Sequence, residues 1–258
     1  MLRTIAGLYL RHEATPVPRP RILELARAAG VSAPAAQTAV SRLIDRGLLE
    51  PVEPATLSVT SPAMAMFARG NRRIFTPRRM EHDDRWVLVA FSLPEALRAT
   101  RHQLRKHFIQ LGGGLVSAGL WIFPEYLRSE VLEVLGALDA RSYATLFISQ
   151  TPDYPGTARQ ASAQWWDLDK LAKLHRAFLT TTAKLDASST DEQAAYLGYV
   201  VLIDAWRAIP YLDPGLPDQI LPNSWPGQES RERFLEISAS FKDRAAEHAA
   251  RLLRPAAG

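Results

Sequence analysis

The sequence predicts an α+β protein that folds as more than one domain. Its 258 residues exceed the usual size of one compact domain, so two or three domains are expected. Helical patterns come first, strand and helix patterns alternate over residues 85–150, and helical patterns fill the remainder. The charge also changes along the chain, from strongly basic to slightly acidic. We therefore expect three parts with different tasks.

The composition argues against several classes of protein. Apolar residues make up 47% and charged residues 22% of the chain, which is not typical of a disordered or fibrous protein. No run approaches the roughly 20 continuous apolar residues of a membrane span, and charge interrupts the N-terminus too early for a signal peptide. The chain contains no cysteine, which excludes disulfides, thiol catalysis and thiolate metal sites. We expect a cytoplasmic protein that contacts no membrane.

Positive charge is concentrated in the first third of the chain. Residues 1–80 contain 12 arginines, no lysine and five acidic residues, which is a net charge of +7. Residues 81–258 contain 19 basic and 22 acidic residues, which is a net charge of −3. This asymmetry is expected of a phosphate-binding module joined to a neutral regulatory body, although a solvated basic face is the common alternative.

Three short helices are predicted before Gly47. Apolar residues near the N-terminus indicate the first. The second has a buried face with the helical spacing 0, 3, 4 and 7, formed by Ile22, Leu25, Ala26 and Ala29. Gly30 ends this helix, and the third is expected over residues 33–46 with Ser32 as its N-cap.

The third helix has one polar face, formed by Gln37, Thr38, Ser41 and Arg42. Glutamine and arginine are suited to bidentate contacts with adenine and guanine edges, and serine or threonine can serve several partners. Two helices joined by a tight Gly-Val-Ser turn have helix-turn-helix geometry. We therefore expect these four residues to read DNA bases, and an ordinary amphipathic hairpin with a solvated face is the alternative.

The segment 48–59 has two β-prone ends around a Pro-Ala turn and predicts the two strands of a wing. Because the wing contains no Lys or Arg, we expect the DNA backbone to be contacted from elsewhere. The expected phosphate contacts are arginines near the wing and near a helix predicted over 62–70, namely Arg42, Arg46, Arg69, Arg72, Arg73, Arg78 and Arg79. The predicted DNA-binding domain is 1–70, followed by a linker over 71–84.

The middle segment predicts a ferredoxin-like domain over 85–150, because its elements follow the order β-α-β-β-α-β. The expected elements are strand 85–91, helix 96–111, strands 115–117 and 120–123, helix 129–138 and strand 143–149. The triple glycine 112–114 is followed by no Gly-Lys-Ser/Thr, so it indicates a chain break and not a phosphate loop. His102 and His107 lie five residues apart, off a common helical face, so no zinc site is predicted.

The C-terminal domain, residues 160–258, is predicted to be helical, with helices over 165–184, 192–209 and 230–253. Five prolines and two glycines make the stretch 210–227 between the last two helices irregular. The aromatic residues of this stretch either line an effector pocket or anchor the loop by packing.

Several blocks of sequence occur in an order that resembles one family. These blocks are 37–43, 72–75, 86–95, 119–122, 166–168, 212–217, 221–222 and 225–227. On these blocks the chain resembles the PaaX family of repressors of phenylacetate degradation. The resemblance implies a middle domain similar to the small subunit of CRISPR integration complexes.

The resemblance also implies a DNA-binding transcription repressor, not an enzyme, that binds a palindromic operator as a homodimer. It implies release from the operator by an effector, phenylacetyl-CoA or another aryl-CoA thioester, and no further cofactor. CoA requires basic groups near an apolar slot, and Arg207 beside Trp206 is one such place. The candidate effector-binding residues are therefore Trp206, Arg207, Tyr211 and Trp225.

Three other functions are alternatives. A metal-dependent nuclease is suggested by the fold relatives of the middle domain, but the first strand ends in Ala90-Phe91-Ser92 without the carboxylate that Mg²⁺ needs. An acyl-CoA enzyme would need a nucleophile elbow, a Ser/His/Asp cluster or a zinc helix, and no such motif is visible. A dimeric scaffold would bind no specific DNA. No catalytic residue and no metal site is predicted.

Overall fold

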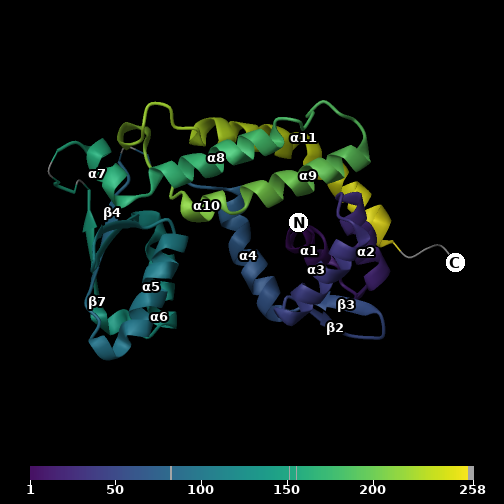
Figure 1. The fold of residues 1–258 in the computed structure, drawn as a ribbon, viewed down its shortest axis with the longest axis horizontal. Coiled ribbons are helices and arrows are strands. Elements are labelled where there is room, and N and C mark those ends of the chain that lie inside the picture. The colour runs from purple at the N-terminus through teal and green to yellow at the C-terminus, as the bar shows by residue number, and fades with distance from the viewer. Residues whose placement is uncertain (82, 151, 155, 255–258) are drawn as a thin grey trace. The chain divides into compact units, whose positions relative to one another are not determined.

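The computed structural model describes residues 1–81, 83–150, 152–154 and 156–254 of an α+β protein (Figure 1). The chain forms two compact units, and neither of them is continuous in sequence. Unit 1 contains Met1–Thr76, Ala177–Arg207 and the described chain from Gln228, and unit 2 contains Pro77–Arg176 and Ala208–Gly227. The segment 160–258, which we expected to form one helical domain, is therefore shared between the two units.

The N-terminal part of unit 1 combines short helices with a small sheet. Its helices are α1 (Leu2–Leu8), α2 (Arg19–Ala28), α3 (Ala33–Asp45) and α4 (Ser61–Phe75). Its strands are β1 (Val17–Pro18), β2 (Leu49–Pro51) and β3 (Thr56–Val59), antiparallel in the order β1-β3-β2. Strand β1 has two residues, too few for a periodic pattern, and was not expected.

Helix α4 is longer than the sequence indicated, and the predicted linker 71–84 begins inside it. The glycine that suggested an end, Gly70, is a buried residue in the helix interior. The helix ends at Phe75, just before Pro77, because a proline disfavours helical backbone at the residue that precedes it. At the other end, the Thr60 hydroxyl accepts the amide N–H of Ala63 at 3.2 Å and caps the helix.

The turn between α2 and α3 depends on the backbone of Gly30. Its φ of +77° is accessible to glycine at little cost, and the amide of Val31 donates to the carbonyl of Ala26 at 3.0 Å. Ser32 occupies the N-cap position of α3, but its side chain makes no capping hydrogen bond. The predicted N-cap position is therefore confirmed, but the side chain of Ser32 does not satisfy a backbone donor of the first turn.

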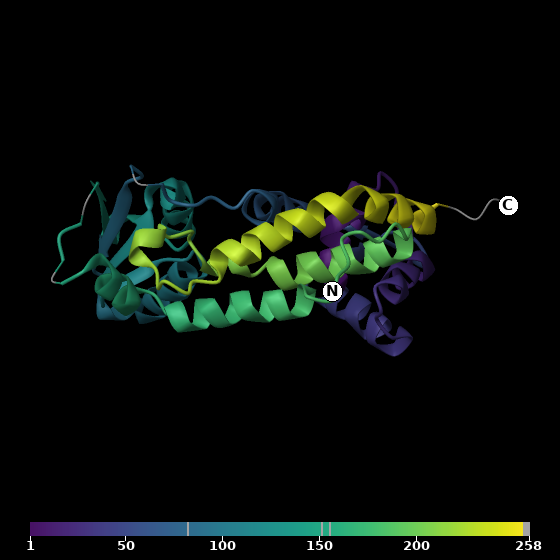
Figure 2. The same cartoon turned by 90° about the horizontal axis from the view of Figure 1, so that it is seen from above.

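Helices from the second half of the chain complete unit 1. They are α9 (Glu192–Trp206), α11 (Gly227–Leu253) and the end of α8 (Leu168–Thr182), and α9 lies alongside α11 in Figure 2. The hydroxyl of Tyr196 on α9 donates to the carbonyl of Leu25 on α2 at 2.9 Å, and burial raises the pKa of this hydroxyl, which keeps it a donor. Gly198 allows the ring of Phe241 to approach, since a Cβ at this position would lie 2.4 Å from it.

Unit 2 is built around a four-stranded antiparallel sheet in the order β5-β6-β4-β7. The elements follow one another as β4 (Trp86–Phe91), α5 (Arg98–Gln110), β5 (Gly114–Ser117), β6 (Leu120–Pro124), α6 (Arg128–Ala137) and β7 (Ala144–Ser149). Helices α5 and α6 cover one face of the sheet (Figure 1). On this face Val87 and Val89 pack against Phe108 and Val131.

The opposite face of this sheet packs against a second apolar cluster that includes Trp166, Leu171 and Leu216. Helix α7 (Ala158–Trp165), the start of α8 and the short α10 (Ile209–Leu212) lie in this part of unit 2. Helix α7 was not predicted, although Thr157 and Gln160 form a capping box, which is a recognisable sequence signal.

Candidate functional site

Helix α3 separates a buried face from an exposed face. Ala36, Val40 and Leu43 are buried in unit 1. The four residues predicted to read DNA bases are all exposed on this helix: Gln37, Thr38, Ser41 and Arg42. The apolar spacing of the sequence thus places all four polar side chains on the accessible surface.

The hydroxyls of this face are held by the helix itself. Thr38 Oγ1 donates to the carbonyl of Pro34 at 3.0 Å, and Ser41 Oγ donates to the carbonyl of Gln37 at 3.3 Å. Each hydroxyl oxygen still has lone pairs to accept a hydrogen bond. Together with the amide of Gln37 and the guanidinium of Arg42, the face offers several donors and acceptors to a polar partner.

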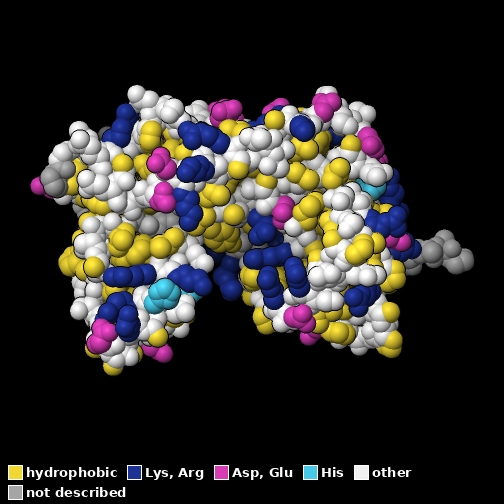
Figure 3. Space-filling view, in the orientation of Figure 1, with side chains coloured by type: hydrophobic (Ala, Val, Ile, Leu, Met, Phe, Trp, Pro, Cys, Tyr) yellow, Lys and Arg dark blue, Asp and Glu magenta, His cyan; other side chains and the backbone are white. Residues whose placement is uncertain are grey.

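Helix α4 supplies positive charge without acidic neighbours in sequence, since no Asp or Glu occurs between Glu53 and Glu81. Arg69 and Arg72 are exposed on α4, and Arg73 is half-buried. Basic side chains gather over this helix in Figure 3. Arg46, directly after α3, is also exposed. An anionic polymer would find exposed guanidinium groups here, which suits contacts to a phosphate backbone.

Arg78 and Arg79, which we also expected to contact phosphate, have partners inside unit 2. The guanidinium carbon of Arg78 lies 4.5 Å from the ring centroid of Tyr126, a cation–π contact. Arg79 forms an ion pair with Asp218. Glu50 on β2 and Glu53 in the loop between β2 and β3 are exposed. This hairpin contains no arginine, so the exposed arginines near α3 lie outside it.

The four predicted effector-binding residues are divided between the two units. Trp206 and Arg207 belong to unit 1, and Tyr211 and Trp225 belong to unit 2. Trp206 is a core residue, 2% exposed, stacked on Phe234 with ring centroids 4.6 Å apart, and its indole N–H donates to the carbonyl of Ile74 at 2.9 Å. Arg207 Nε donates to Asp204 at 3.2 Å.

The two effector candidates in unit 2 lie in and beside the loop that follows α10. Trp225 packs with its ring centroid 5.6 Å from that of the buried His175, and Tyr211 is half-buried in α10. His175 Nε2 lies 2.9 Å from Asp213 Oδ2, and Asp213 Oδ1 accepts the amide of Gly215 at 2.8 Å. These contacts fasten the proline-rich loop to α8, so this stretch is anchored by packing and polar contacts.

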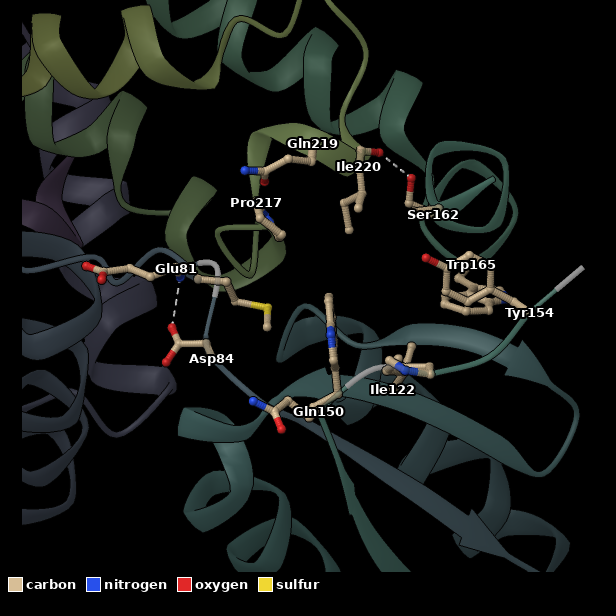
Figure 4. Close-up of a pocket in the computed structure, with 14 residues that line it drawn as sticks. Glu81, Asp84, Ile122, Gln150, Tyr154, Ser162, Trp165, Pro217, Gln219 and Ile220 are labelled. Atoms are coloured by element: carbon tan, nitrogen blue, oxygen red, sulfur yellow. Dashed lines mark hydrogen bonds between the residues drawn. The ribbon is translucent and has the colours of Figure 1, made fainter. Parts of the chain in front are cut away.

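Unit 2 contains a cavity of about 210 Å³ that the sequence did not reveal (Figure 4). Parts of the chain that are far apart in sequence line it: Met80, Glu81, Asp84 and Trp86, then Ile122, and in part residues 150–165 and 217–220. None of the four predicted effector-binding residues lines it. No sequence motif marks the cavity, because only the packing of these segments creates it.

The described part of the chain shows neither a metal-binding cluster nor a membrane-spanning helix. Among these residues, no group of three or more His, Asp or Glu side chains is placed to hold a metal ion. No helix there is both long enough and apolar enough to cross a bilayer.

The fold and the exposed faces define an α+β protein with a polar, arginine-bearing helical surface in one unit and a ligand-sized cavity in the other. A family model described as the PaaX protein central Cas2-like domain matches residues 79–162, and a model described as the PaaX-like protein C-terminal domain matches residues 166–251. The chain belongs to the PaaX family.

Individual proteins also resemble the chain, and one is a repressor of known name. The transcriptional repressor PaaX of Escherichia coli (strain K12) is 23% identical over 189 residues, which are 70% of this chain and 59% of that protein's length. The structure of the uncharacterized protein Rv0674 from Mycobacterium tuberculosis is similar, with a TM-score of 0.59 and 17% identity, and the match covers 95% of this chain and 97% of that one. The second likeness supports the fold along nearly the whole chain.

Proposed function

We propose that this protein is a transcription repressor that binds double-stranded DNA through helix α3. The observation that carries the proposal is the exposed row of Gln37, Thr38, Ser41 and Arg42 on a helix whose other face is buried. A helix inserted in the major groove needs such a row of short and long hydrogen-bonding side chains. The Escherichia coli relative is named a transcriptional repressor, which supports the same function. The name also favours a regulator over an enzyme.

The arrangement around α3 supports a winged helix-turn-helix. Helices α2 and α3 are joined by the Gly30 turn, and β2 and β3 form a hairpin directly after α3. The hairpin lacks arginines, so the proposed phosphate contacts come from Arg46, Arg69, Arg72 and Arg73. Such contacts fix the position of a protein on the duplex without reading sequence.

The strand order and helix placement in unit 2 support a ferredoxin-like domain. In the order β5-β6-β4-β7, the first and third strands of the βαββαβ unit are neighbours at the centre and both helices lie on one face. We further propose that the repressor is a homodimer on a palindromic operator of an aromatic-acid catabolic operon, released by an aryl-CoA thioester. These finer points rest on the family to which the chain belongs.

The test is a mobility-shift titration of the full chain against genomic fragments from around its own gene, with and without phenylacetyl-CoA. Sequence-selective binding that the thioester abolishes supports both the repressor and its effector class. Selective binding that phenylacetyl-CoA does not change supports the repressor function and rejects this effector. Absence of selective binding rejects the repressor function, and the scaffold and enzyme alternatives are then tested.

A matched pair of variants assigns the binding to α3. Arg42→Ala is expected to weaken selective binding, whereas Arg98→Ala, an equally exposed arginine on α5 of unit 2, leaves it unchanged. EDTA-sensitive digestion of the same fragments would instead support the nuclease alternative.

A further inference from the structure

Three tryptophans of unit 2 form a chain of ring contacts beside the cavity. The ring centroid of Trp166 lies 6.0 Å from that of Trp86 and 6.1 Å from that of Trp165. Trp166 is buried, and its indole N–H donates to the carbonyl of Gly112 at 2.9 Å, which fixes the central ring. Trp86 and Trp165 are half-buried, and both line the cavity. Two partly exposed indoles are therefore held at the cavity by a buried third.

The wall beside these indoles is also apolar. Ile122 belongs to the second apolar cluster of unit 2, and Ile220 packs against the same cluster. In Figure 4 the side chain of Ile220 points into the cavity, and Tyr154 and Trp165 lie together on another side of it. The rings of these two residues meet edge to face, with centroids 5.6 Å apart at an angle of 84°. Partly exposed rings that border a cavity can make the same contacts with another flat ring.

The charged lining residues do not face the inside of the cavity. In Figure 4 the carboxylates of Glu81 and Asp84 point away from it, and Asp84 Oδ2 accepts the amide N–H of Glu81 at 2.9 Å. The hydroxyl of Ser162 donates to the carbonyl of Ile220. Among the 14 described lining residues there is no lysine, arginine or histidine. These lining residues therefore offer no facing charge to a bound molecule.

The size of the cavity and the lack of a facing charge together define the class of ligand. The volume of about 210 Å³ exceeds the roughly 150 Å³ of an apolar cavity that accepts benzene. There is room for one six-membered ring with a short substituent. An ion in this cavity would lose hydration without gaining a partner of opposite charge, and an uncharged ring has no such cost.

We propose that this cavity is a binding site for an uncharged aromatic molecule of one ring with a short neutral substituent. The ring of the ligand lies against Trp86 and Trp165, and Ile122 and Ile220 bury its remaining surface. Burial of apolar surface and ring contacts supply the affinity, and the lack of a facing charge disfavours cations and anions alike. The site depends neither on DNA binding nor on the proposed thioester effector, so its failure leaves the repressor function untouched.

The test is calorimetric titration of the full chain, near neutral pH, with three ligands that share one ring and differ in charge: 2-phenylethanol, 2-phenylethylamine and phenylacetate. We expect the alcohol to bind on the order of tenfold more tightly than either ion, because burial of an unpaired charge is costly. Equal or tighter binding of either ion overturns the proposal, and so does the absence of alcohol binding at millimolar concentration.

A pair of variants on helix α7 locates the binding. Ala158 is half-buried and lines the cavity, whereas Ala163 is exposed on the same helix and does not line it. Ala158→Phe adds a ring to the cavity wall and is expected to abolish measurable binding of 2-phenylethanol, and Ala163→Phe is expected to leave it unchanged. Circular dichroism checks that both variants are folded. Undiminished binding in folded Ala158→Phe would overturn the assignment to this cavity.

A second variant tests the ring contacts without adding bulk. Trp165→Leu keeps an apolar side chain and removes the indole ring. The ratio of the affinities for 2-phenylethanol and its saturated analogue 2-cyclohexylethanol is expected to fall about threefold, because one aromatic pair is lost. An unchanged ratio would show that Trp165 does not contact the ligand ring, which contradicts the proposed geometry.

Discussion

One tryptophan and a few arginines in each unit differ in exposure and in their partners. In unit 1 the ring of Trp206 is enclosed, stacked on Phe234, while arginines such as Arg72 are exposed on α4. In unit 2 the ring of Trp165 is partly exposed at a cavity, while Arg79 and Arg85 are paired with carboxylates. An accessible guanidinium can meet an anionic polymer, and an accessible ring at a cavity can stack on another flat group. These residues therefore suit different kinds of partner in the two units.

The largest expected effect concerns the two tryptophans. Trp206→Ala removes a fully packed ring and an indole hydrogen bond, so it is expected to lower the free energy of unfolding by about 3–5 kcal/mol. Trp165→Ala, at a half-exposed ring, is expected to lower it by about 1 kcal/mol. Urea denaturation followed by circular dichroism measures both. Equal losses of unfolding free energy would show that the two rings stabilise the fold equally, which contradicts the difference in packing described for Trp206 and Trp165.

The next effect concerns base recognition. Arg42→Ala is expected to reduce discrimination between operator and unrelated DNA by about 1–3 kcal/mol, because one bidentate contact to a base edge contributes that much. Competition mobility shifts measure it, with Arg98→Ala as the control. Unchanged selectivity would remove Arg42 from the base-reading surface.

The cap of α4 should matter more than a matched cap in unit 2. Thr60 is 8% exposed and also donates to the carbonyl of Gly47 at 2.6 Å, whereas Thr157 caps α7 at an exposed position. Loss of a cap typically lowers stability by about 0.5–2 kcal/mol, so Thr60→Ala is expected near the upper value and Thr157→Ala near the lower. Thermal denaturation ranks the two variants, and the reverse order would contradict the role assigned to Thr60.

The smallest effect concerns phosphate contacts. Arg72→Ala is expected to weaken binding of all DNA sequences alike and to reduce the slope of log affinity against log salt by about 1. Arg78→Ala is expected to leave that slope unchanged, because Arg78 lies over the ring of Tyr126 in unit 2. Binding titrations at several salt concentrations measure both slopes. A sequence-selective loss for Arg72→Ala would contradict a phosphate role.

Local sequence patterns were sufficient to predict much of the fold. The spacing of Ala36, Val40 and Leu43 predicts which side of α3 is exposed, and the structure exposes the polar residues expected there. The β-α-β-β-α-β order could be predicted because the elements have their own apolar patterns and glycines or prolines separate several of them. The roles of those residues in DNA binding stay a prediction until they are measured.

Features that depend on contacts between distant segments could not be predicted from local sequence patterns. The sequence predicts the helix α9, but it does not show that the N-terminal helices pack against it, which contacts such as the hydrogen bond from Tyr196 to the carbonyl of Leu25 reveal. The sequence likewise marks Trp206 as a large aromatic residue without saying whether its ring faces a ligand or Phe234.

The sequence by itself determined most of the helices and strands, the polar face of α3 and the basic N-terminal third, because these depend on neighbours within a few residues. Tertiary structure alone decided how the C-terminal helices divide between two units and where a cavity forms. Burial and cavities depend on which apolar surfaces meet across the fold, and periodicity identifies such a surface without identifying its partner.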